Sequence, residues 1–478
     1  MREYLKFYID GEWVEQAGTR TWEVINPATE EVAGLIALGG KEDVNRAVAA
    51  ARRAFESWSR TSREERIDML GRIAEIYKTR FDDMCAAITE EMGAPDWVAR
   101  KAQAPAPLAH LKIAIEVLKN YHFEEVRGST LIRREPIGVC GLITPWNWPA
   151  AVVATKVVPA LATGCTMVLK PSEYSPFSAQ IIAEVMDKAG VPPGVFNLVY
   201  GDGPVVGTEL ASHPDIDMIS FTGSIRAGVD VATKAAPTVK RVHQELGGKS
   251  PNIILEDADF EKSVTAGVRG VMFNSGQTCS APTRMLVPRS RMAEAAAIAG
   301  RAAAEMAPGR PDGKAFMGPV VNKRQWYKIQ VMVDSGLGEG ATLVAGGHDR
   351  PEGFEQGFYA KPTIFSDVTS DMTIAREEIF GPVLVIMAYE DVEDAIRIAN
   401  DTPYGLAAYI HGTDMEKMRE IGGRLRAGQV YINGSGLDII DPAAPFGGYK
   451  RSGNGREWGE FGFEAFLEVK AIIGYNPA

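Results

Sequence analysis

The run Val139-Cys140-Gly141-Leu142-Ile143 is the first of several short apolar segments that decide the fold. Three more runs of this kind follow along the chain, at Met167–Leu169, Phe196–Val199 and Met218–Phe221. Continuous apolar runs of this length are typical of strands buried on both faces. Helical patterns separate them at Ser178–Ala189 and Val205–Ala211. The alternation predicts an α/β fold, with a parallel sheet that carries helices on both faces.

A second α/β series begins after Glu245. Its expected strands are Asn252–Leu255, Arg284–Val287, Val383–Met387 and Tyr431–Asn433, and its expected helices lie around Asp259–Arg269, Met292–Ala304 and Val392–Ala399. We therefore expect two α/β lobes that meet near Gly247-Gly248.

The first third of the chain has a helical pattern. Apolar residues recur at helical spacing from Val44 to Trp58. Ser62 with Glu65 has the spacing of a capping box, which predicts a helix start there and a run toward a glycine stop at Gly93.

Composition narrows the function. The chain has 478 residues, 45% hydrophobic and 24% charged, which is ordinary for a globular protein of two or more domains. A net charge of −11 works against binding to nucleic acid or to an anionic membrane surface. The most apolar stretch, Val139–Leu169, contains three prolines and Lys156, so we interpret it as strand, loop and helix rather than a spanning helix.

The cysteines and histidines exclude two further classes. The four cysteines are scattered without a Cys-x-x-Cys pair, which favours a reducing, cytoplasmic location over a disulfide scaffold. The six histidines show no ligand spacing, so no metal site is expected. The mixed polar and apolar N-terminus does not resemble a signal peptide.

One cysteine has a polar, glycine-bearing context, Phe273-Asn274-Ser275-Gly276-Gln277-Thr278-Cys279. An acid framed by small residues lies upstream in Glu245-Leu246-Gly247-Gly248-Lys249. This pair suits attack of a thiolate on a carbonyl, followed by carboxylate-assisted hydrolysis. The alternative is a buried structural thiol, the interpretation that we give to Cys140 and Cys165.

These two segments, together with five others, resemble the NAD(P)-dependent aldehyde dehydrogenase superfamily. The other five are Pro145-Trp146-Asn147, Lys170-Pro171-Ser172-Glu173, Phe221-Thr222-Gly223-Ser224, Glu378-Ile379-Phe380-Gly381-Pro382 and Pro445-Phe446-Gly447-Gly448-Tyr449-Lys450. The resemblance runs from about Ile25 to about Val469.

The resemblance implies two Rossmann-like lobes and a small β element that forms oligomers. The cofactor-binding lobe would comprise residues 1–113 and 135–246, and the catalytic lobe residues 247–450. The oligomerisation element would comprise residues 114–134 and 451–478, in a homodimer or homotetramer.

The resemblance also implies catalytic roles. Cys279 would attack an aldehyde, the Asn147 amide and the Cys279 backbone N–H would hold the oxyanion, and Glu245 would activate water for thioester hydrolysis after hydride transfer. Lys156 resembles a family lysine whose charge would favour the thiolate. Glu457 resembles an acid credited with proton relay, and the alternative for it is an exposed acid at a helix start.

The cofactor residues implied by the resemblance are Trp146, Lys170, Glu173, Gly223, Ser224, Glu378 and Phe380. Glu173 predicts NAD over NADP, because a carboxylate accepts ribose hydroxyls and repels a 2′-phosphate. On pattern alone, Thr222-Gly223-Ser224 is also typical of an ordinary strand-to-helix turn, and Lys170 with Glu173 of a solvated loop. Glu377-Glu378 is likewise typical of a charged helix end. Gly201-Asp202-Gly203 looks like a dinucleotide fingerprint, but we interpret it as a structural turn because Asp202 would repel phosphates.

The aldehyde pocket is expected from Trp148, Val152, Thr155, Thr278, Ser280, Leu437 and Phe446, with Ile439 and Ile440 in the same loop as Leu437. Val152 and Thr155 are smaller than the residues common in acetaldehyde-oxidising members, which predicts a medium or large apolar aldehyde, aliphatic or aromatic. Members that oxidise succinate semialdehyde have an arginine at the Thr155 position, although Arg284 would be able to compensate.

There are four alternatives, three of which differ in the residues that they require. A semialdehyde dehydrogenase of this family is the alternative by substrate. A CoA-acylating relative would lack Glu245, since CoA takes the acyl group in place of water. A non-catalytic structural member would have no need for Cys279, and a plain thiol hydrolase would have none for Glu378 or Thr222-Gly223-Ser224.

Overall fold

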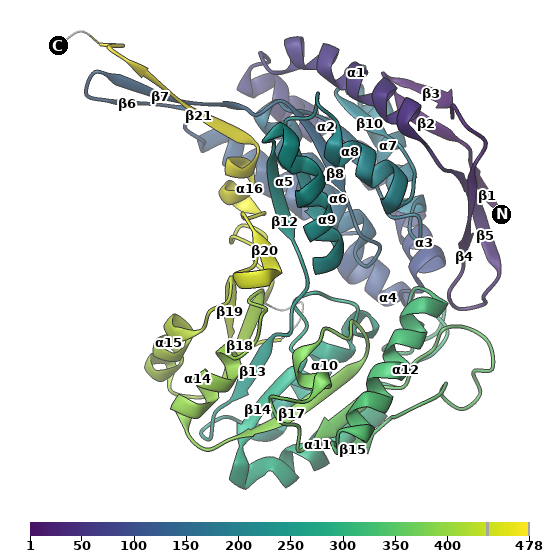
Figure 1. The fold of residues 1–478 in the computed structure, drawn as a ribbon, viewed down its shortest axis with the longest axis vertical. Coiled ribbons are helices and arrows are strands. Elements are labelled where there is room, and N and C mark those ends of the chain that lie inside the picture. Colours follow the sequence, from purple (N-terminus) through teal and green to yellow (C-terminus); the bar gives the residue numbers. More distant parts are fainter. Residues whose placement is uncertain (436–438, 477–478) are drawn as a thin grey trace.

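The computed structural model describes residues 1–435 and 439–476. Two lobes, each built on a β-sheet, lie one above the other, and a narrow arm of strands projects from the upper one (Figure 1). The chain passes from the first sheet to the second between Glu245 and Pro251.

The first sheet has eight strands in the order β20-β12-β11-β8-β9-β10-β2-β3. Its parallel centre consists of β12 (Arg241–Glu245), β11 (Met218–Thr222), β8 (Val139–Ile143), β9 (Thr166–Lys170) and β10 (Phe196–Leu198). The edges are antiparallel and consist of β2 (Lys6–Ile9), β3 (Glu12–Glu15) and β20 (Gly453–Asn454). The four strands predicted for this sheet are confirmed as β8, β9, β10 and β11. Every residue of β8 and β9 is buried, as expected for strands covered on both faces.

Helices cover both faces of this sheet. On one side α1 (Lys41–Trp58) contacts β8, β9 and β10, and it also contacts α8 (Thr208–Ser212). Against the same strands pack α6 (Pro149–Thr163) and α7 (Phe177–Ala189), and a further layer lies over these two. That layer consists of α2 (Arg63–Thr79), α3 (Phe81–Met92) and α5 (Ala106–Asn120), and α4 (Asp96–Val98) precedes α5. The helix α9 (Ile225–Ala235) packs on β11 and β12.

The second sheet has seven strands in the order β15-β16-β17-β14-β13-β18-β19. Six of them are parallel: β16 (Thr363–Ser366), β17 (Val383–Tyr389), β14 (Arg284–Pro288), β13 (Pro251–Ile254), β18 (Ala407–His411) and β19 (Gln429–Ile432). The antiparallel edge strand is β15 (Thr342–Ala345).

Neighbouring residues of these strands enter two different cores, as the two-residue period of a strand requires. Ile254 and Met285 pack with α10 (Phe260–Met272) and α11 (Met292–Ala304). Ile253 and Leu286 pack on the other face. The helices there are α12 (Lys323–Gly338), α13 (Thr373–Arg376), α14 (Val392–Asn400) and α15 (Met415–Arg424).

Two small sheets complete the fold. The projecting arm pairs β6 (Glu124–Arg127) and β7 (Thr130–Pro136) with β21 (Leu467–Ile473), which follows α16 (Gly459–Ala465). The N-terminal sheet contains β1 (Arg2–Tyr4), β5 (Val32–Ala37) and β4 (Thr21–Ile25). The arm thus joins the two segments in which strands were expected, although they lie far apart in the chain.

The capping box at the start of α2 is confirmed. The Ser62 hydroxyl accepts from the Glu65 N–H at 3.1 Å, and the Glu65 carboxylate accepts from the Ser62 N–H at 2.7 Å. The run to Gly93 is two helices and not one, because the chain turns at Arg80. Arg80 pairs there with Asp83 and with Glu184 of α7 at 2.6 Å, which holds the turn against a neighbouring helix.

Three inner strands escaped the sequence analysis. β12 reads Arg241-Val242-His243-Gln244-Glu245 and has one aliphatic residue, while β16 and β18 mix polar and small residues with few aliphatic ones. These strands are defined by their neighbours in the sheet rather than by their own apolar pattern. The missed strand β12 carries Glu245, so the error concerns the element that positions the predicted base.

The order of strands in the first sheet reverses beside β8. From β8 the chain adds β9 and β10 on one side, and it then returns to add β11 and β12 on the other. In open parallel sheets, ligands bind at such a switch point, outside the carboxyl ends of the strands. The loops that leave β8 and β11 there are Thr144–Asn147 and Gly223–Ser224.

Within residues 1–435 and 439–476, no helix combines the length and the apolar composition needed to cross a bilayer. All four cysteines are free, and Cys140 and Cys165 are fully buried in the first core, as predicted.

Candidate active site

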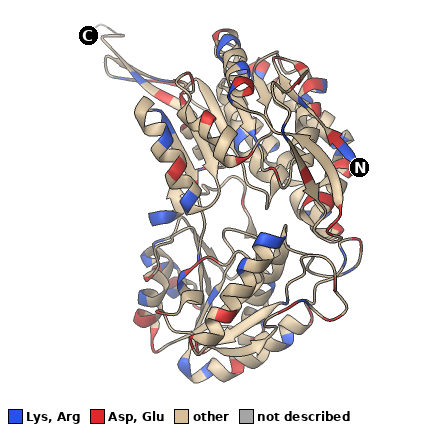
Figure 2. Cartoon of the chain, turned by 45° about the vertical axis from the view of Figure 1, so that its right-hand side comes forward, with Lys and Arg blue, Asp and Glu red and all other residues tan. Residues whose placement is uncertain are grey.

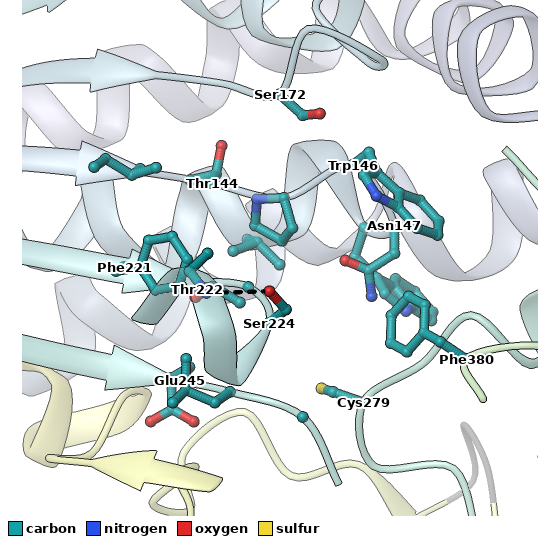
Figure 3. A pocket seen from close by; sticks show the side chains of 18 of the residues that line it. Thr144, Trp146, Asn147, Ser172, Phe221, Thr222, Ser224, Glu245, Cys279 and Phe380 are labelled. Carbon is teal, nitrogen blue, oxygen red and sulfur yellow. Dashed lines mark hydrogen bonds between the residues drawn. The ribbon is translucent and has the colours of Figure 1, made fainter. Parts of the chain in front are cut away.

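One large cavity lies at the switch point, between the two lobes. Its volume is about 1810 Å³, and residues of both sheets line it. Trp146, Asn147 and Ser224 border it from the first lobe, and Cys279 and Phe380 from the second (Figure 3). Figure 2 shows the two lobes from a second direction, joined by a few connecting segments. The cavity therefore brings together sequence motifs that are separated by more than a hundred residues.

The loop before Cys279 has an uncommon backbone. Asn274, Ser275 and Gly276 have φ angles of 54°, 55° and 73°, three successive residues in the left-handed region. A Cβ on Gly276 would lie 2.0 Å from the carbonyl oxygen of Gly381, so only glycine allows the segment after Phe380 to pack here. This packing explains why the two motifs occur together.

Hydrogen bonds from both lobes hold this loop. The Asn274 amide nitrogen donates to the carbonyl of Asn147 at 3.1 Å, and the Asn274 amide oxygen accepts from Gln103 at 3.0 Å. On the other side, the Gln277 amide oxygen accepts from the Val321 N–H at 2.9 Å. The sulfur is thus presented by a loop whose buried polar groups are paired across the lobes.

Asn147 lies against the same loop. Its amide nitrogen donates to the carbonyl of Gln277 at 3.0 Å, and it is 5% exposed. Figure 3 shows its side chain extending toward Cys279. An amide nitrogen carries two protons, so the second is free to serve an oxyanion formed next to the sulfur.

The thiol of Cys279 is protonated in this arrangement. Burial raises its pKa to about 12, and the carboxyls of Glu378 and Glu245 act in the same direction. The ammonium of Lys156, which is expected to favour the thiolate, is bound to other groups in this structure. It contacts the Glu457 carboxylate at 2.6 Å and the Ser220 hydroxyl at 2.9 Å.

Glu245 ends β12 and is 2% exposed, yet it lines the cavity. Neither carboxylate oxygen has a hydrogen-bond partner among the described residues. Burial raises its pKa well above the usual value, and the nearby Glu457 adds to the effect. Its carboxylate is directed away from the sulfur of Cys279 (Figure 3), so a rotation of the side chain has to precede any action there.

Glu457 is buried, 5% exposed, which contradicts the alternative of an exposed acid at a helix start. Burial opposes ionisation of this carboxyl, but the ammonium of Lys156 prevails and lowers its pKa. The pair therefore forms a buried salt bridge at the floor of the cavity, which Glu457 and Glu245 both border.

The turn after β11 begins helix α9. Ser224 is its N-cap, and its hydroxyl accepts from the Ala227 N–H at 3.3 Å. Gly223 and Ser224 border the cavity, and the buried hydroxyls of Thr144 and Thr222 have no partner within the described ranges. A helix N-terminus with unpaired donors beside it suits the phosphates of a dinucleotide.

Lys170 ends β9, and its ammonium lies 3.5 Å from the carboxylate of Glu173. Burial lowers the pKa of Lys170, and Glu173 opposes this effect. Both residues line the cavity and are mostly buried, so the alternative of a solvated loop is wrong.

The glycine turn at Gly203 has a mixed outcome. Asp202 accepts from the Val205 N–H at 2.8 Å and pairs with Arg20, which is the structural role that we predicted. Gly203 and Gly207 nevertheless border the cavity, which the sequence analysis did not foresee.

Glu378 and Phe380 approach from the second lobe. The carboxylate of Glu378 accepts from the Gly248 N–H at 3.0 Å, and burial raises its pKa. The Phe380 ring meets Trp146 edge-on, with centroids 5.4 Å apart. A Cβ on Gly247 would lie 2.3 Å from the Glu378 carboxylate, so the glycine pair between the lobes leaves space for this acid.

The predicted aldehyde pocket lies at the other end of the cavity. The described members of that set all line it: Trp148, Val152, Thr155, Thr278, Ser280 and Phe446. Trp148 donates to the Thr278 hydroxyl at 3.1 Å, and Phe446 stacks on Trp458 with centroids 4.5 Å apart. Leu437 lies outside the described residues, while Ile440 lines the cavity.

Comparison with known proteins identifies the family. The aldehyde dehydrogenase family model matches residues 13–472. The chain belongs to the aldehyde dehydrogenase family. The predicted family and the α/β fold are thereby confirmed, and the fold agrees with solved relatives at TM-scores of 0.97 and 0.96.

Two curated relatives extend over the whole chain. A 3-succinoylsemialdehyde-pyridine dehydrogenase of Pseudomonas sp. is 56% identical over 478 residues, which is 100% of both proteins. A putative aldehyde dehydrogenase of Staphylococcus saprophyticus is 48% identical, over 99% of this chain and 100% of its own length.

Two solved structures are similarly close. Aldehyde dehydrogenase C of Pseudomonas syringae, crystallised as a mutant with NAD⁺ and octanal, is 55% identical with a TM-score of 0.97, over 99% of this chain and 97% of its own. An NAD⁺ complex of aldehyde dehydrogenase from Bacillus cereus is 38% identical with a TM-score of 0.94, over 98% and 96%.

This aldehyde dehydrogenase also has cavity residues that the sequence analysis missed. Ala102, Ala106, Ala109 and His110, in and just before α5, line the aldehyde end. Burial lowers the pKa of His110 to about 4, so this ring is neutral. The small residues recur at helical spacing, but nothing in the sequence distinguishes a cavity face from a packed face.

Arg284 does not compensate for the missing arginine at position 155. It is 1% exposed and donates to the carbonyls of Lys249, Ile398 and Ala399 inside the second lobe. None of the cavity-lining residues is Arg284, so no part of it is available to a substrate carboxylate.

We expect the Cys279 thiol of the free enzyme to react slowly with iodoacetamide at neutral pH. Because its pKa is raised to about 12, the thiolate fraction should grow about tenfold per pH unit between about pH 7 and 10. The alkylation rate measured against pH, with Cys279→Ser as the background control, checks this. A plateau of the rate below about pH 9 would contradict it.

Proposed function

We propose that this aldehyde dehydrogenase oxidises a medium or large apolar aldehyde, aliphatic or aromatic, to the carboxylic acid with NAD. The observation that carries the proposal is that Cys279, Asn147 and Glu245 border one cavity with the turn after β11. Thiol, oxyanion donor, base and dinucleotide site thus meet within reach of one small substrate.

NAD fits the residues that are present. Gly223 and Ser224 at the start of α9 would hold the pyrophosphate, with the unpaired Thr222 hydroxyl beside them. Glu378 and Phe380 would hold the nicotinamide riboside, next to Trp146. The bound cofactor supplies the acceptor for the hydride that leaves the substrate carbon.

Glu173 supports NAD as the preferred cofactor. Its carboxylate borders the cavity beside Lys170, at the end of β9. There it would accept the two adenosine ribose hydroxyls, and it would repel the charge of a 2′-phosphate. Solved relatives with bound NAD⁺ are consistent with this assignment.

The chain's own residues divide the remaining chemistry. As the sulfur of Cys279 bonds to the aldehyde carbon, the carbonyl π bond breaks to give the oxyanion and the thiol proton passes to solvent water. The raised pKa keeps that proton on the sulfur until then. The Asn147 amide and the Cys279 N–H stabilise the oxyanion, each worth about 2.7–4 kcal/mol in related acyl chemistry. Loss of hydride from that carbon leaves a thioester.

Glu245 would complete the cycle. As a water oxygen bonds to the thioester carbon, Glu245 takes the water proton and the carbon–sulfur bond breaks, releasing acid and thiolate. Its raised pKa makes it a stronger base than an exposed glutamate once it has ionised. Glu457 and Lys156 would then carry the proton away, because Glu457 lines the same cavity and Lys156 pairs with it at 2.6 Å.

Breadth at the aldehyde end supports the substrate class. Val152, the alanines of α5 and the rings of Trp148 and Trp458 all line the cavity, and the small side chains take up little of its volume. One similar protein was solved with octanal, and another takes its name from a semialdehyde that carries a pyridine ring. A semialdehyde with a large distal group is therefore the second candidate substrate.

Glu245 favours hydrolysis over acyl transfer to CoA, since CoA-acylating relatives lack that acid.

For the assembly, we propose that the arm of β6, β7 and β21 joins subunits into a homodimer or homotetramer. Val469 and Ile473 on β21 are 62% and 82% exposed, and a contact between copies would cover them. We also propose the domain division expected from the sequence, in which the cofactor-binding lobe ends at residue 246, the catalytic lobe begins at residue 247 and the arm belongs to a separate oligomerisation element.

We expect Glu245→Gln to separate the two half-reactions. The variant should form about one equivalent of NADH per active site and then stall, because the thioester forms but is not hydrolysed. Stopped-flow absorbance at saturating NAD and octanal measures the burst, with Glu209→Gln, a partly exposed acid of α8 that does not line the cavity, as the matched control. Multiple turnovers at the wild-type rate would overturn the role of Glu245.

We expect Glu173→Gln to weaken discrimination between cofactors. Removing the carboxylate's charge should lower the NAD-to-NADP ratio of kcat/KM by about tenfold or more, since it removes repulsion of the 2′-phosphate. Initial rates with each cofactor at one aldehyde concentration give the ratio. An unchanged ratio contradicts the assignment.

We expect Val152→Phe to narrow the aldehyde end of the cavity. The kcat/KM for octanal and for an aromatic aldehyde should fall about 10- to 200-fold relative to propanal, because the ring occupies the space that the longer chain needs. Leu343→Phe, on the edge strand β15, is the control. Equal losses for all three aldehydes would place the substrate elsewhere.

A further inference from the structure

A chain of buried polar groups connects the salt bridge at the floor of the cavity to Glu245. The ammonium of Lys156 donates to the Ser220 hydroxyl at 2.9 Å, and this hydroxyl lies 3.3 Å from Nδ1 of His243. Nε2 of His243 in turn lies 3.5 Å from the Glu245 carboxylate. All four side chains are less than 9% exposed.

The direction of this chain follows from its first member. An ammonium has protons to donate and no lone pair, so the Ser220 oxygen acts as acceptor toward Lys156. The single Ser220 proton then needs an acceptor, and Nδ1 of His243 is the acceptor that the described residues offer. A neutral ring that accepts at Nδ1 carries its proton on Nε2.

The ring is neutral and Nε2 faces the base. Burial lowers the pKa of His243 to about 4, with the positive charges of Lys156 and Arg456 acting in the same direction. The oxygen of Glu457 that lies 3.9 Å from Nδ1 is beyond hydrogen-bond length and already accepts from Lys156. No other described group near Nδ1 therefore accepts a proton from it, and the ring adopts the tautomer with its proton on Nε2.

Nε2 of His243 and the Glu245 carboxylate are both without a hydrogen-bond partner in the described part of the chain. Two buried groups that lack partners, one a donor and one an acceptor, face each other at 3.5 Å. A movement of a few tenths of an ångström gives a full hydrogen bond, whereas without it a buried donor and a buried acceptor both stay unsatisfied.

We propose that His243 is a positioning residue that holds the carboxylate of Glu245 in its withdrawn orientation by donating from Nε2, with Lys156 and Ser220 fixing the tautomer. This inference rests on the proposed role of Glu245 as the hydrolytic base. The withdrawn carboxylate leaves the space beside the sulfur to the aldehyde during attack (Figure 3).

The donated proton also favours the ionised base. The titratable and charged groups that face Glu245 are His243 on the same strand, Lys156 on α6, Cys279, and Arg456 and Glu457 after β20. Burial and Glu457 raise the pKa of Glu245, whereas a hydrogen bond from a neutral donor stabilises the carboxylate. Removing that donor should raise the pKa of Glu245 further. As pH falls, hydrolysis should then begin to lose rate at a higher pH than in the wild-type enzyme.

The test compares His243→Leu, which keeps the volume without a donor, with His243→Gln, which keeps a donor. Rapid mixing with NAD and octanal separates the NADH burst, which reports attack and hydride loss, from the later steady rate, which reports hydrolysis. In His243→Leu the acid limb of the steady rate should move up by about one pH unit, and the burst should slow by more than about twofold, because the carboxylate is no longer held out of the space beside the sulfur. His243→Gln should restore the limb toward the wild-type position.

Two further variants complete the design. Ser220→Ala should shift the limb in the same direction by a smaller amount, because the tautomer is no longer fixed, and it tests the chain if His243→Leu does not fold. His411→Gln alters another buried histidine, on β18, and should leave the profile unchanged. An acid limb that does not move in His243→Leu and Ser220→Ala, or that moves down, overturns the proposal. If Glu245→Gln keeps full hydrolysis, the proposed function fails instead, whatever the His243 variants do.

Discussion

The loop that carries Cys279 keeps its shape through the buried amide of Asn274, on which the rest of the site depends. Asn274 and Ser275 lie in the left-handed region, which costs on the order of 1–3 kcal/mol for each non-glycine residue. The Asn274 side chain bonds Asn147, Gln103 and Gln277, and each such bond contributes about 0.5–1.5 kcal/mol. The cost and the gain are of similar size, so the loop is stable only when both lobes supply its partners. The same bonds set the distance between the sulfur and the amide of Asn147.

Electrostatics in the cavity favour neutral resting forms. Cys279 and Glu245 have raised pKa values chiefly because the fold desolvates both, and nearby carboxyls add to the effect, Glu378 and Glu245 at the thiol and Glu457 at Glu245. Lys156 pairs with Glu457, so this buried ammonium stabilises a second acid. In the proposed mechanism, such a site forms its nucleophile only during attack on a carbonyl. That property suits an enzyme whose thiol would otherwise be open to oxidation.

Local signals predicted several elements accurately, and the failures have physical causes. The Ser62–Glu65 capping box and the apolar strands β8 and β11 follow from short-range rules that operate within a few residues. The turn at Arg80 depends on Glu184 of another helix, and the polar strand β12 depends on its neighbours β11 and β20. The alanines of α5 have a regular pattern, but whether they face a cavity or a packed core depends on the other segments that line the same space, among them Trp148 and Trp458.

The sequence by itself determined the α/β class and the family, and it singled out Cys279, Glu245 and Asn147 as the candidate thiol, acid and amide of the site. Each of these three residues lies in a short motif of consecutive residues. Only the tertiary structure decided how these groups are charged and oriented. Burial raises the pKa of Cys279, Lys156 pairs with Glu457, and His243 faces Glu245, and none of these follows from residues that are neighbours in the chain. The reason is that desolvation and ion pairing depend on the distances between elements, which exist only once both lobes are folded together.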